Sequence, residues 1–131
     1  MTKPLAVITG ASSGIGEATA KAFSAAGYPT LLLARRLERM EALSLPNSMC
    51  RQVDVRNRDE LVAAIREAEA EYGPTDMIFN NAGVARLADI GTQPPEDWDE
   101  MIAINTNGVM NGVYAVTVSY THLTLPTKNE V

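Results

Sequence analysis

The amino-acid sequence predicts an α/β fold, a doubly wound parallel sheet with helices on both faces. Two observations lead to this prediction. Apolar runs of strand length recur along the chain without alternating polar residues, which is typical of strands covered on both faces. Segments with a helical spacing of apolar residues lie between these runs, so strand and helix alternate four times. This order favours parallel strands joined by right-handed crossovers.

The first strand is predicted at residues 5–9, where five residues form a continuous apolar run. A glycine-rich turn at residues 10–16 interrupts the run, and an alanine-rich helix follows. Gly27 stands where a glycine commonly ends a helix. The helix face that we expect to be buried comprises Ala18, Ala22, Phe23 and Ala26.

The second buried strand is predicted at residues 30–34, and a short helix is expected from Arg35 to just before Pro46. The third strand is predicted at residues 50–55. Its first residue, Cys50, is the only cysteine of the chain and so cannot form an internal disulfide. We expect Cys50 to be a small buried apolar residue in a reducing compartment.

A third helix is predicted after Asn57, because Asn57 and Glu60 have the spacing of a capping box. Gly73 and Pro74 carry the signal for its end. Its buried face is expected to comprise Leu61, Val62, Ile65, Ala68 and Tyr72.

The fourth strand is predicted at residues 77–79, and it runs into Asn80-Asn81-Ala82-Gly83. A loop containing Pro94 and Pro95 then leads to a long helix. On this helix an apolar stripe with i, i+3, i+4 and i+7 spacing is expected to face the sheet. The stripe comprises Trp98, Met101, Ile102 and Asn105.

The glycine-rich turn has chemistry suited to binding a phosphate. It lies between a strand and a helix, and backbone N–H groups at a helix N-terminus attract anions. Gly10, Gly14 and Gly16 allow a tight turn and a close approach of a pyrophosphate to the backbone. A strand-to-helix turn without a ligand is the alternative at this point.

Three motifs in order resemble the short-chain dehydrogenase/reductase family. The first is T-G-x-x-x-G-I-G at residues 9–16, the second is N-N-A-G at residues 80–83, and the third is N-x-x-G at residues 105–108. The resemblance covers residues 4 to about 117. It implies a Rossmann-like doubly wound sheet that is truncated after the fourth strand and the following long helix.

The resemblance also implies which residues bind the family's nicotinamide cofactor. The cofactor-binding residues carried over from the motifs are Gly10, Ser12, Ser13, Gly14, Ile15, Gly16, Asn81, Ala82 and Gly83. Asp54 and Val55, at the end of the third strand, would lie near the adenine amino group. The carboxylate of Asp54 can accept a hydrogen bond from that group. Asn105 corresponds to the catalytic asparagine that holds a water in the family's proton relay. An ordinary polar strand end is the alternative for Asp54 and Val55, and a packed asparagine without a catalytic role is the alternative for Asn105.

The end of the second strand bears on the choice of cofactor. Arg35 and Arg36 stand there, and no acidic residue precedes Glu38. In the dinucleotide-binding fold an acidic residue at this point binds the ribose 2′-OH of NAD, whereas an arginine accommodates the 2′-phosphate of NADP. We therefore expect Arg35 and Arg36 to bind NADP, and NAD is the alternative cofactor. The alternative for the two residues is that they are solvated surface arginines that bind no cofactor.

The family's substrate-orienting serine and its Tyr-x-x-x-Lys pair are not found here. Val118 and Thr124 occupy the fourth position after Tyr114 and Tyr120. The ten residues 118–127 also match the translation of transposon-end adaptor DNA used in preparing sequencing libraries. We interpret residues 1–117 as an incomplete NAD(P)-binding domain and 118–131 as a non-native tail; a natural frameshift or a divergent terminus is the alternative.

The function expected for the parent protein is hydride transfer between NADP(H) and an alcohol or carbonyl compound. The chain as given is expected to be inactive, and a non-catalytic dinucleotide-binding module is the alternative. His122 receives no catalytic role, and we assign no metal site.

The bulk properties exclude several other classes. The net charge of −5 argues against nucleic acid as a partner. No apolar run is long enough to span a bilayer, and the N-terminal residues lack the pattern of a signal peptide. We expect a cytoplasmic protein whose parent is a homodimer or homotetramer.

Overall fold

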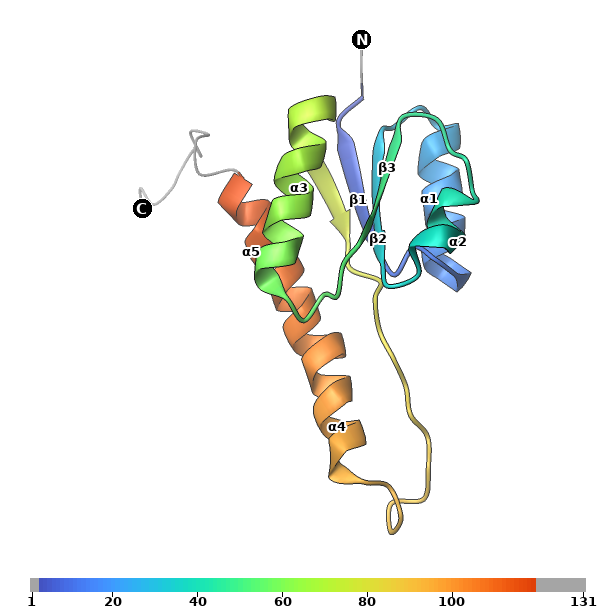
Figure 1. The fold of residues 1–131 in the computed structure, drawn as a ribbon, viewed down its shortest axis with the longest axis vertical. Coiled ribbons are helices and arrows are strands. Elements are labelled where there is room, and N and C mark those ends of the chain that lie inside the picture. The colour runs from blue at the N-terminus through green and yellow to red at the C-terminus, as the bar shows by residue number, and fades with distance from the viewer. Residues whose placement is uncertain (1–2, 120–131) are drawn as a thin grey trace, which may run out of the picture.

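The computed structural model describes residues 3–119, and within them four parallel strands form one sheet (Figure 1). The strands are β1 (Leu5–Thr9), β2 (Thr30–Ala34), β3 (Ser48–Gln52) and β4 (Thr75–Phe79). Their order in the sheet is β3-β2-β1-β4, with Val7 of β1 aligned with Leu31 of β2 and with Ile78 of β4. The predicted α/β parallel sheet is therefore confirmed.

Helices cover both faces of the sheet. Helices α1 (Gly14–Ala25) and α2 (Leu37–Glu41) lie on one face, and α3 (Arg58–Tyr72) and α5 (Gly108–Ser119) lie on the other (Figure 1). A π-helix, η1 (Ala103–Asn107), joins α5 to α4 (Pro95–Ile102). Helix α4 and the loop before it extend beyond the carboxyl ends of the strands (Figure 1).

Alternate residues of the strands enter two separate cores. Leu5 and Val7 of β1 pack with the apolar face of α3 and with Ala115 of α5. Ile8 of β1 and Leu32 of β2 pack instead with α1 and α2. This alternation follows from the period of two in a strand, and it explains why the central strands β1 and β2 are buried at every position.

The first two strands have the predicted bounds, whereas β3 and β4 differ. Strand β3 begins two residues earlier than predicted and ends at Gln52. The Val53 N–H still donates to the carbonyl of Ala34, but Val53 and Val55 then pack into the core beneath α3. Strand β4 begins at Thr75, which is buried and donates from its N–H and hydroxyl to the Glu69 carboxylate.

The predicted buried face of α1 is wrong. Ala18, Ala22 and Ala26 are exposed, and the buried residues of the helix are Gly16 and Ala20. Alanines occupy several faces of this helix, so the apolar spacing does not distinguish among them. The close packing of Gly16 beneath the glycine-rich turn sets the rotation of the helix instead.

The predicted third helix is confirmed. The Asn57 side chain accepts from the N–H of Glu60 at 3.2 Å, and its amide donates to the Glu60 carboxylate at 3.1 Å. The predicted face is the packed one, with Leu61, Ile65 and Ala68 buried and Val62 and Tyr72 partly buried.

The stripe predicted on the long helix is also wrong. Trp98 and Ile102 are 42 % and 56 % exposed, and α4 has no buried residue among those described. The helix packs on the rest of the chain further along, through Ile104, Asn111 and Ala115. Two features explain the difference. Helix α4 lies beyond the sheet, and the i→i+5 turn of η1 holds an extra residue that shifts the packed face.

None of the helices within residues 3–119 is long and apolar enough to cross a membrane.

Candidate functional site

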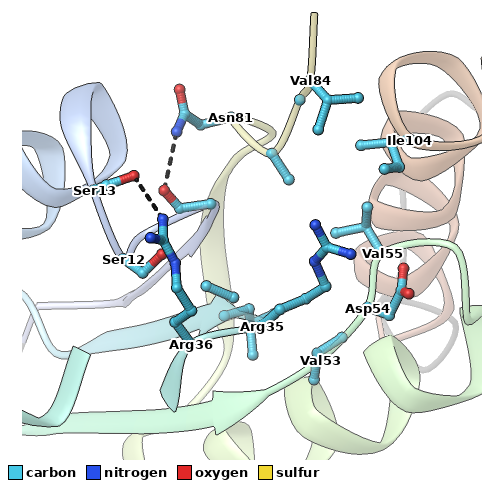
Figure 2. Close-up of a pocket in the computed structure, with 15 residues that line it drawn as sticks. Ser12, Ser13, Arg35, Arg36, Val53, Asp54, Val55, Asn81, Val84 and Ile104 are labelled. Atoms are coloured by element: carbon cyan, nitrogen blue, oxygen red, sulfur yellow. Dashed lines mark hydrogen bonds between the residues drawn. The ribbon is translucent and has the colours of Figure 1, made fainter. Parts of the chain in front are cut away.

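A cleft of about 560 Å³ lies at the carboxyl ends of the strands (Figure 2). In open parallel sheets, ligands bind at this edge. The cleft is built from the loops that follow all four strands and from the start of the π-helix. Its lining residues are Gly10, Ser12, Ser13, Leu33, Ala34, Arg35, Arg36, Val53, Asp54, Val55, Asn81, Ala82, Gly83, Val84 and Ile104.

The glycine-rich turn forms the floor of the cleft and admits no side chain at two of its glycines. Gly10 has φ +65°, and a Cβ there would lie 2.9 Å from the Cα of Ala82. A Cβ on Gly16 would collide with the carbonyl oxygen of Gly10 and lie 2.6 Å from the Asn81 amide nitrogen. The glycines therefore let the turn, the N-terminus of α1 and the segment after β4 approach one another closely.

The N-terminus of α1 offers hydrogen-bond donors to an anion. Among the contacts of the described residues, the Ser13 side chain makes no capping hydrogen bond to the helix. The first N–H groups of a helix have no acceptor within the helix. Gly14 and Ile15 stand in this first turn, and Ile15 is 70 % exposed. This helix end can therefore receive a phosphate group.

The segment after β4 is fixed to the end of β1. The Thr9 hydroxyl accepts from the N–H groups of Asn81 and Ala82, each at 3.0 Å. The Asn81 side-chain amide donates to the carbonyl of Gly10 at 3.2 Å. These bonds hold the second motif against the first, and they place Asn81, Ala82 and Gly83 in the wall of the cleft.

Two arginines follow β2 and enter the cleft. The Arg36 guanidinium donates to the Ser13 hydroxyl at 3.3 Å, so it lies beside the glycine-rich turn (Figure 2). Arg35 extends on the side of Asp54 (Figure 2). Both side chains belong to exposed residues, and they make this end of the cleft positively charged.

Asp54 lies in the loop after β3, two residues beyond the strand in which it was predicted. Its carboxylate accepts from Arg56, with 2.6 Å between Nη2 and Oδ2, and from the Arg56 N–H at 2.9 Å. The Arg56 guanidinium lowers the pKa of Asp54 below its ordinary value of 3.8, against the opposing effect of burial, and Arg35 lowers it further. A carboxylate acceptor is therefore present in the cleft at neutral pH.

The Asn105 side chain is bound to the segment after β4. Its oxygen accepts from the N–H of Val84 at 2.8 Å, and its nitrogen donates to the carbonyl of Val84 at 2.7 Å. A Cβ on Gly83 would lie 3.2 Å from the same oxygen. The amide thus lies close to Gly83, although the apolar stripe on which Asn105 was predicted to lie is wrong. Asn105 adjoins the cleft through Ile104 and Val84, which line it.

The family model described as short chain dehydrogenase matches residues 4–122. This chain belongs to the short-chain dehydrogenase family. An uncharacterized oxidoreductase of Listeria innocua is 38 % identical over 120 residues, which cover 87 % of this chain and 48 % of the relative. An NADP-dependent 3-hydroxy acid dehydrogenase of Salmonella typhi is 33 % identical over 120 residues, covering 86 % and 47 % of the two chains.

A solved structure leads to the same family. The closed form of a serine dehydrogenase complexed with NADP+ superposes with a TM-score of 0.82 at 31 % identity, covering 88 % of this chain and 48 % of that one. The chain spans about half the length of the relatives it matches.

Three of the cofactor-binding residues carried over from the short-chain dehydrogenase motifs do not line the cleft. Gly14 and Ile15 are exposed on the first turn of α1, and Gly16 is buried beneath the glycine-rich turn. The other cofactor-binding residues predicted from the sequence all line the cleft. His122 and residues 120–131, most of the predicted tail, lie outside the described residues.

Several functional positions in this short-chain dehydrogenase cleft were missed by sequence reasoning. The hydroxyl of Thr9 connects the first two motifs, and its place at the end of a buried strand was a usable signal. The apolar lining was also missed, because these residues look like ordinary core residues in the sequence. They are Leu33, Ala34, Val53, Val84 and Ile104.

Proposed function

We propose that this chain carries the NADP(H)-binding part of an oxidoreductase that transfers a hydride between NADP(H) and an alcohol or carbonyl compound. The observation that carries the proposal is the contact between Arg36 and Ser13, which brings a guanidinium to the glycine-rich turn. Guanidinium groups match phosphate oxygens in charge and geometry. A 2′-phosphate distinguishes NADP from NAD, and Arg36 offers it a partner.

The residues present fit a dinucleotide. The turn at Gly10 leaves no room for a side chain, so its backbone stays accessible to a pyrophosphate at the N-terminus of α1. Asp54 and Val55 would take the adenine end, and the Asp54 carboxylate can accept from its amino group. Asn81, Ala82 and Gly83 would line the nicotinamide side. The printed names of the Salmonella relative and of the serine dehydrogenase structure, which both include NADP, support the choice.

The bound cofactor would supply the hydride, and this chain's residues would bind and orient it. Asn105 is proposed as a catalytic residue that holds a water of the proton relay, on the strength of its match to the family motif. Both polar atoms of its amide pair with Val84, so the side chain is fixed in one orientation. Asn105 is an exposed residue, so a water molecule can reach it from solvent.

A second candidate is binding without catalysis. The 131 residues contain no Tyr-x-x-x-Lys, the pair that exchanges the substrate proton in the family. We propose that the chain as given binds the dinucleotide and does not catalyse hydride transfer. A panel of alcohols and carbonyl compounds, monitored by NADPH absorbance, distinguishes the two candidates, since measurable turnover would require another proton donor within these residues.

The remaining expectations are proposals as well. We propose a small-molecule alcohol or carbonyl substrate, a cytoplasmic location and a homodimeric or homotetrameric parent. Exposed apolar residues on α5, including Met110, Val113 and Tyr114, support an assembly. Subcellular fractionation and light scattering test the last two statements directly.

The cofactor proposal is tested by calorimetric titration of the chain with NADP+ and NAD+. We expect NADP+ to bind at least about tenfold more tightly, because a charge-assisted hydrogen bond contributes about 1.5–3 kcal/mol. Arg36→Ala should remove most of this preference. Arg39→Ala is the matched control, since Arg39 is an exposed arginine of α2 outside the cleft. Equal affinity for the two cofactors, or an unchanged preference in Arg36→Ala, would overturn the assignment.

A further inference from the structure

Asn111 is a buried polar residue of α5 that the proposed function does not use. It is 6 % exposed and lies on the face of the helix that packs on the rest of the chain. Its side-chain nitrogen donates to the carbonyl of Val55 at 2.8 Å, and its oxygen accepts from Nε of Arg58 at 3.0 Å. The two bonds fix which end of the amide faces Val55.

The residue that Asn111 contacts belongs to the wall of the cleft. Val55 lines the cleft beside Asp54, in a loop outside the sheet that begins after β3. The helix approaches this loop closely, because a Cβ on Gly108 would lie 2.6 Å from a methyl group of Val55. Val55 therefore packs against α5 through its side chain and is hydrogen-bonded to it through its backbone carbonyl.

The same continuous helix holds the opposite wall. Asn105 in η1 binds Val84 through two hydrogen bonds, and Asn111 in α5 binds Val55. Val84 and Val55 both line the cleft, after β4 and β3 respectively. One rigid helix thus fixes the positions of two loops that no strand pairing connects, since β3 and β4 lie at opposite edges of the sheet.

We propose that Asn111 is a positioning residue for the adenine-side wall of the cleft. It acts by holding the Val55 carbonyl, and so the adjacent Asp54 carboxylate, at a fixed place relative to the glycine-rich turn. Arg58 supports it by orienting the amide, and the Arg58 guanidinium is itself held 5.4 Å from the ring centroid of Tyr114. This inference rests on the proposed function, because it concerns the affinity of the same cleft for the adenosine end of the dinucleotide.

The decisive substitution is Asn111→Asp, which keeps an acceptor for Arg58 and removes the donor to Val55. The matched control is Asn107→Asp, which makes the same change at an exposed residue of η1. Binding of 2′,5′-ADP, the adenosine end of NADP, is measured by calorimetry on the 131-residue chain. We expect Asn111→Asp to weaken it about tenfold, the effect of losing one hydrogen bond, and Asn107→Asp to leave it unchanged.

Hydrogen–deuterium exchange separates positioning from a general loss of stability. In Asn111→Asp, exchange should rise in the segment 53–58 and stay unchanged in the segment 83–86, which Asn105 holds. Arg58→Met provides a second variant at an exposed site, where folding is not at risk, and it should weaken 2′,5′-ADP binding in the same direction but less. Unchanged affinity and unchanged exchange at 53–58 in both variants would overturn the proposal.

The outcomes distinguish this inference from the proposed function. A wild-type chain that binds 2′,5′-ADP while Asn111→Asp binds it equally well retains the function and refutes the role of Asn111. A wild-type chain that binds neither 2′,5′-ADP nor NADP+ refutes the proposed function, and the inference that depends on it.

Discussion

The hydroxyl of Thr9 accepts a hydrogen bond from the backbone N–H of Asn81 at 3.0 Å. The same oxygen accepts from the N–H of Ala82 at 3.0 Å and donates toward the carbonyl of Phe79 at 3.4 Å. One side chain at the end of β1 therefore satisfies the backbone where the chain leaves β4. This threonine therefore joins the first family motif to the second, across 72 residues of sequence.

Thr9→Val is expected to lower the free energy of unfolding by about 1–3 kcal/mol. The valine keeps the shape but removes the hydroxyl acceptor of the Ala82 N–H, and it leaves the Asn81 N–H with the Phe79 carbonyl alone. Chemical denaturation measures this change. Thr19→Val is the control, since the Thr19 hydroxyl donates to the Ile15 carbonyl within an exposed part of α1. If both variants lose the same stability, the bonds to Asn81 and Ala82 are not the cause.

Gly16→Ala is expected to destabilise the chain by about 1–3 kcal/mol, the usual cost of overpacking, and to abolish tight dinucleotide binding. The new Cβ would meet backbone at Gly10 rather than a flexible side chain, so the turn itself must move. Gly91→Ala is the control, because a Cβ there meets nothing within 4 Å. Differential scanning calorimetry and titration with NADP+ check the two effects, and wild-type behaviour of Gly16→Ala would contradict the role given to this glycine.

The strands and their order with the helices could be predicted from the sequence, whereas the buried face of α1 could not. β1 and β2 were predicted with the correct bounds because every residue in them is buried, which leaves a continuous apolar signal. Helix α1 carries alanine on several faces, so nothing in the sequence marks Gly16 and Ala20 as the buried side. The π-helix also escaped prediction, because its extra residue per turn leaves no compositional trace.

Site residues that belong to a sequence motif could be predicted. Residues that reach the site only through a contact in the folded structure could not. The motif residues Gly10, Asn81 and Gly83 line the cleft as expected. The role inferred for Asn111 depends on a hydrogen bond to Val55, 56 residues away in the sequence. Spacing along the chain contains no information about such a bond, because it depends on how α5 crosses the sheet.

Stability is expected to fall in acid partly through Asp54. Hydrogen bonds from Arg56 lower the pKa of Asp54 in the folded chain, so the ion pair stabilises the fold above the ordinary value of 3.8. That contribution is lost as the pH falls through the lowered pKa. The difference in the free energy of unfolding between wild type and Asp54→Asn should be constant from about pH 7 to 5 and shrink in stronger acid. Asp99→Asn, an exposed aspartate of α4, controls for the lost charge; a difference that grows in acid would contradict the assignment.

Asn105→Ala is expected to separate turnover from cofactor affinity. The variant loses both hydrogen bonds to Val84, so exchange of the Val84 N–H with deuterium should accelerate. The adenine-side wall, held by Asn111, and the glycine-rich turn are untouched. NADP+ affinity should therefore change by less than about threefold, which is well below the change in affinity expected from losing a hydrogen bond to a charged group.

In a parent enzyme that supplies the family's tyrosine and lysine, Asn105→Ala should lower turnover by a larger factor than it lowers affinity. Proton transfer by positioned groups contributes about 100-fold or more to the rate, and loss of the water that Asn105 would hold should interrupt that transfer. Asn107→Ala, at an exposed residue of the same π-helix, is the control for both measurements. An Asn105→Ala enzyme with normal turnover but weakened NADP+ binding would mean that the Val84 wall holds the cofactor and that the asparagine has no part in the chemistry.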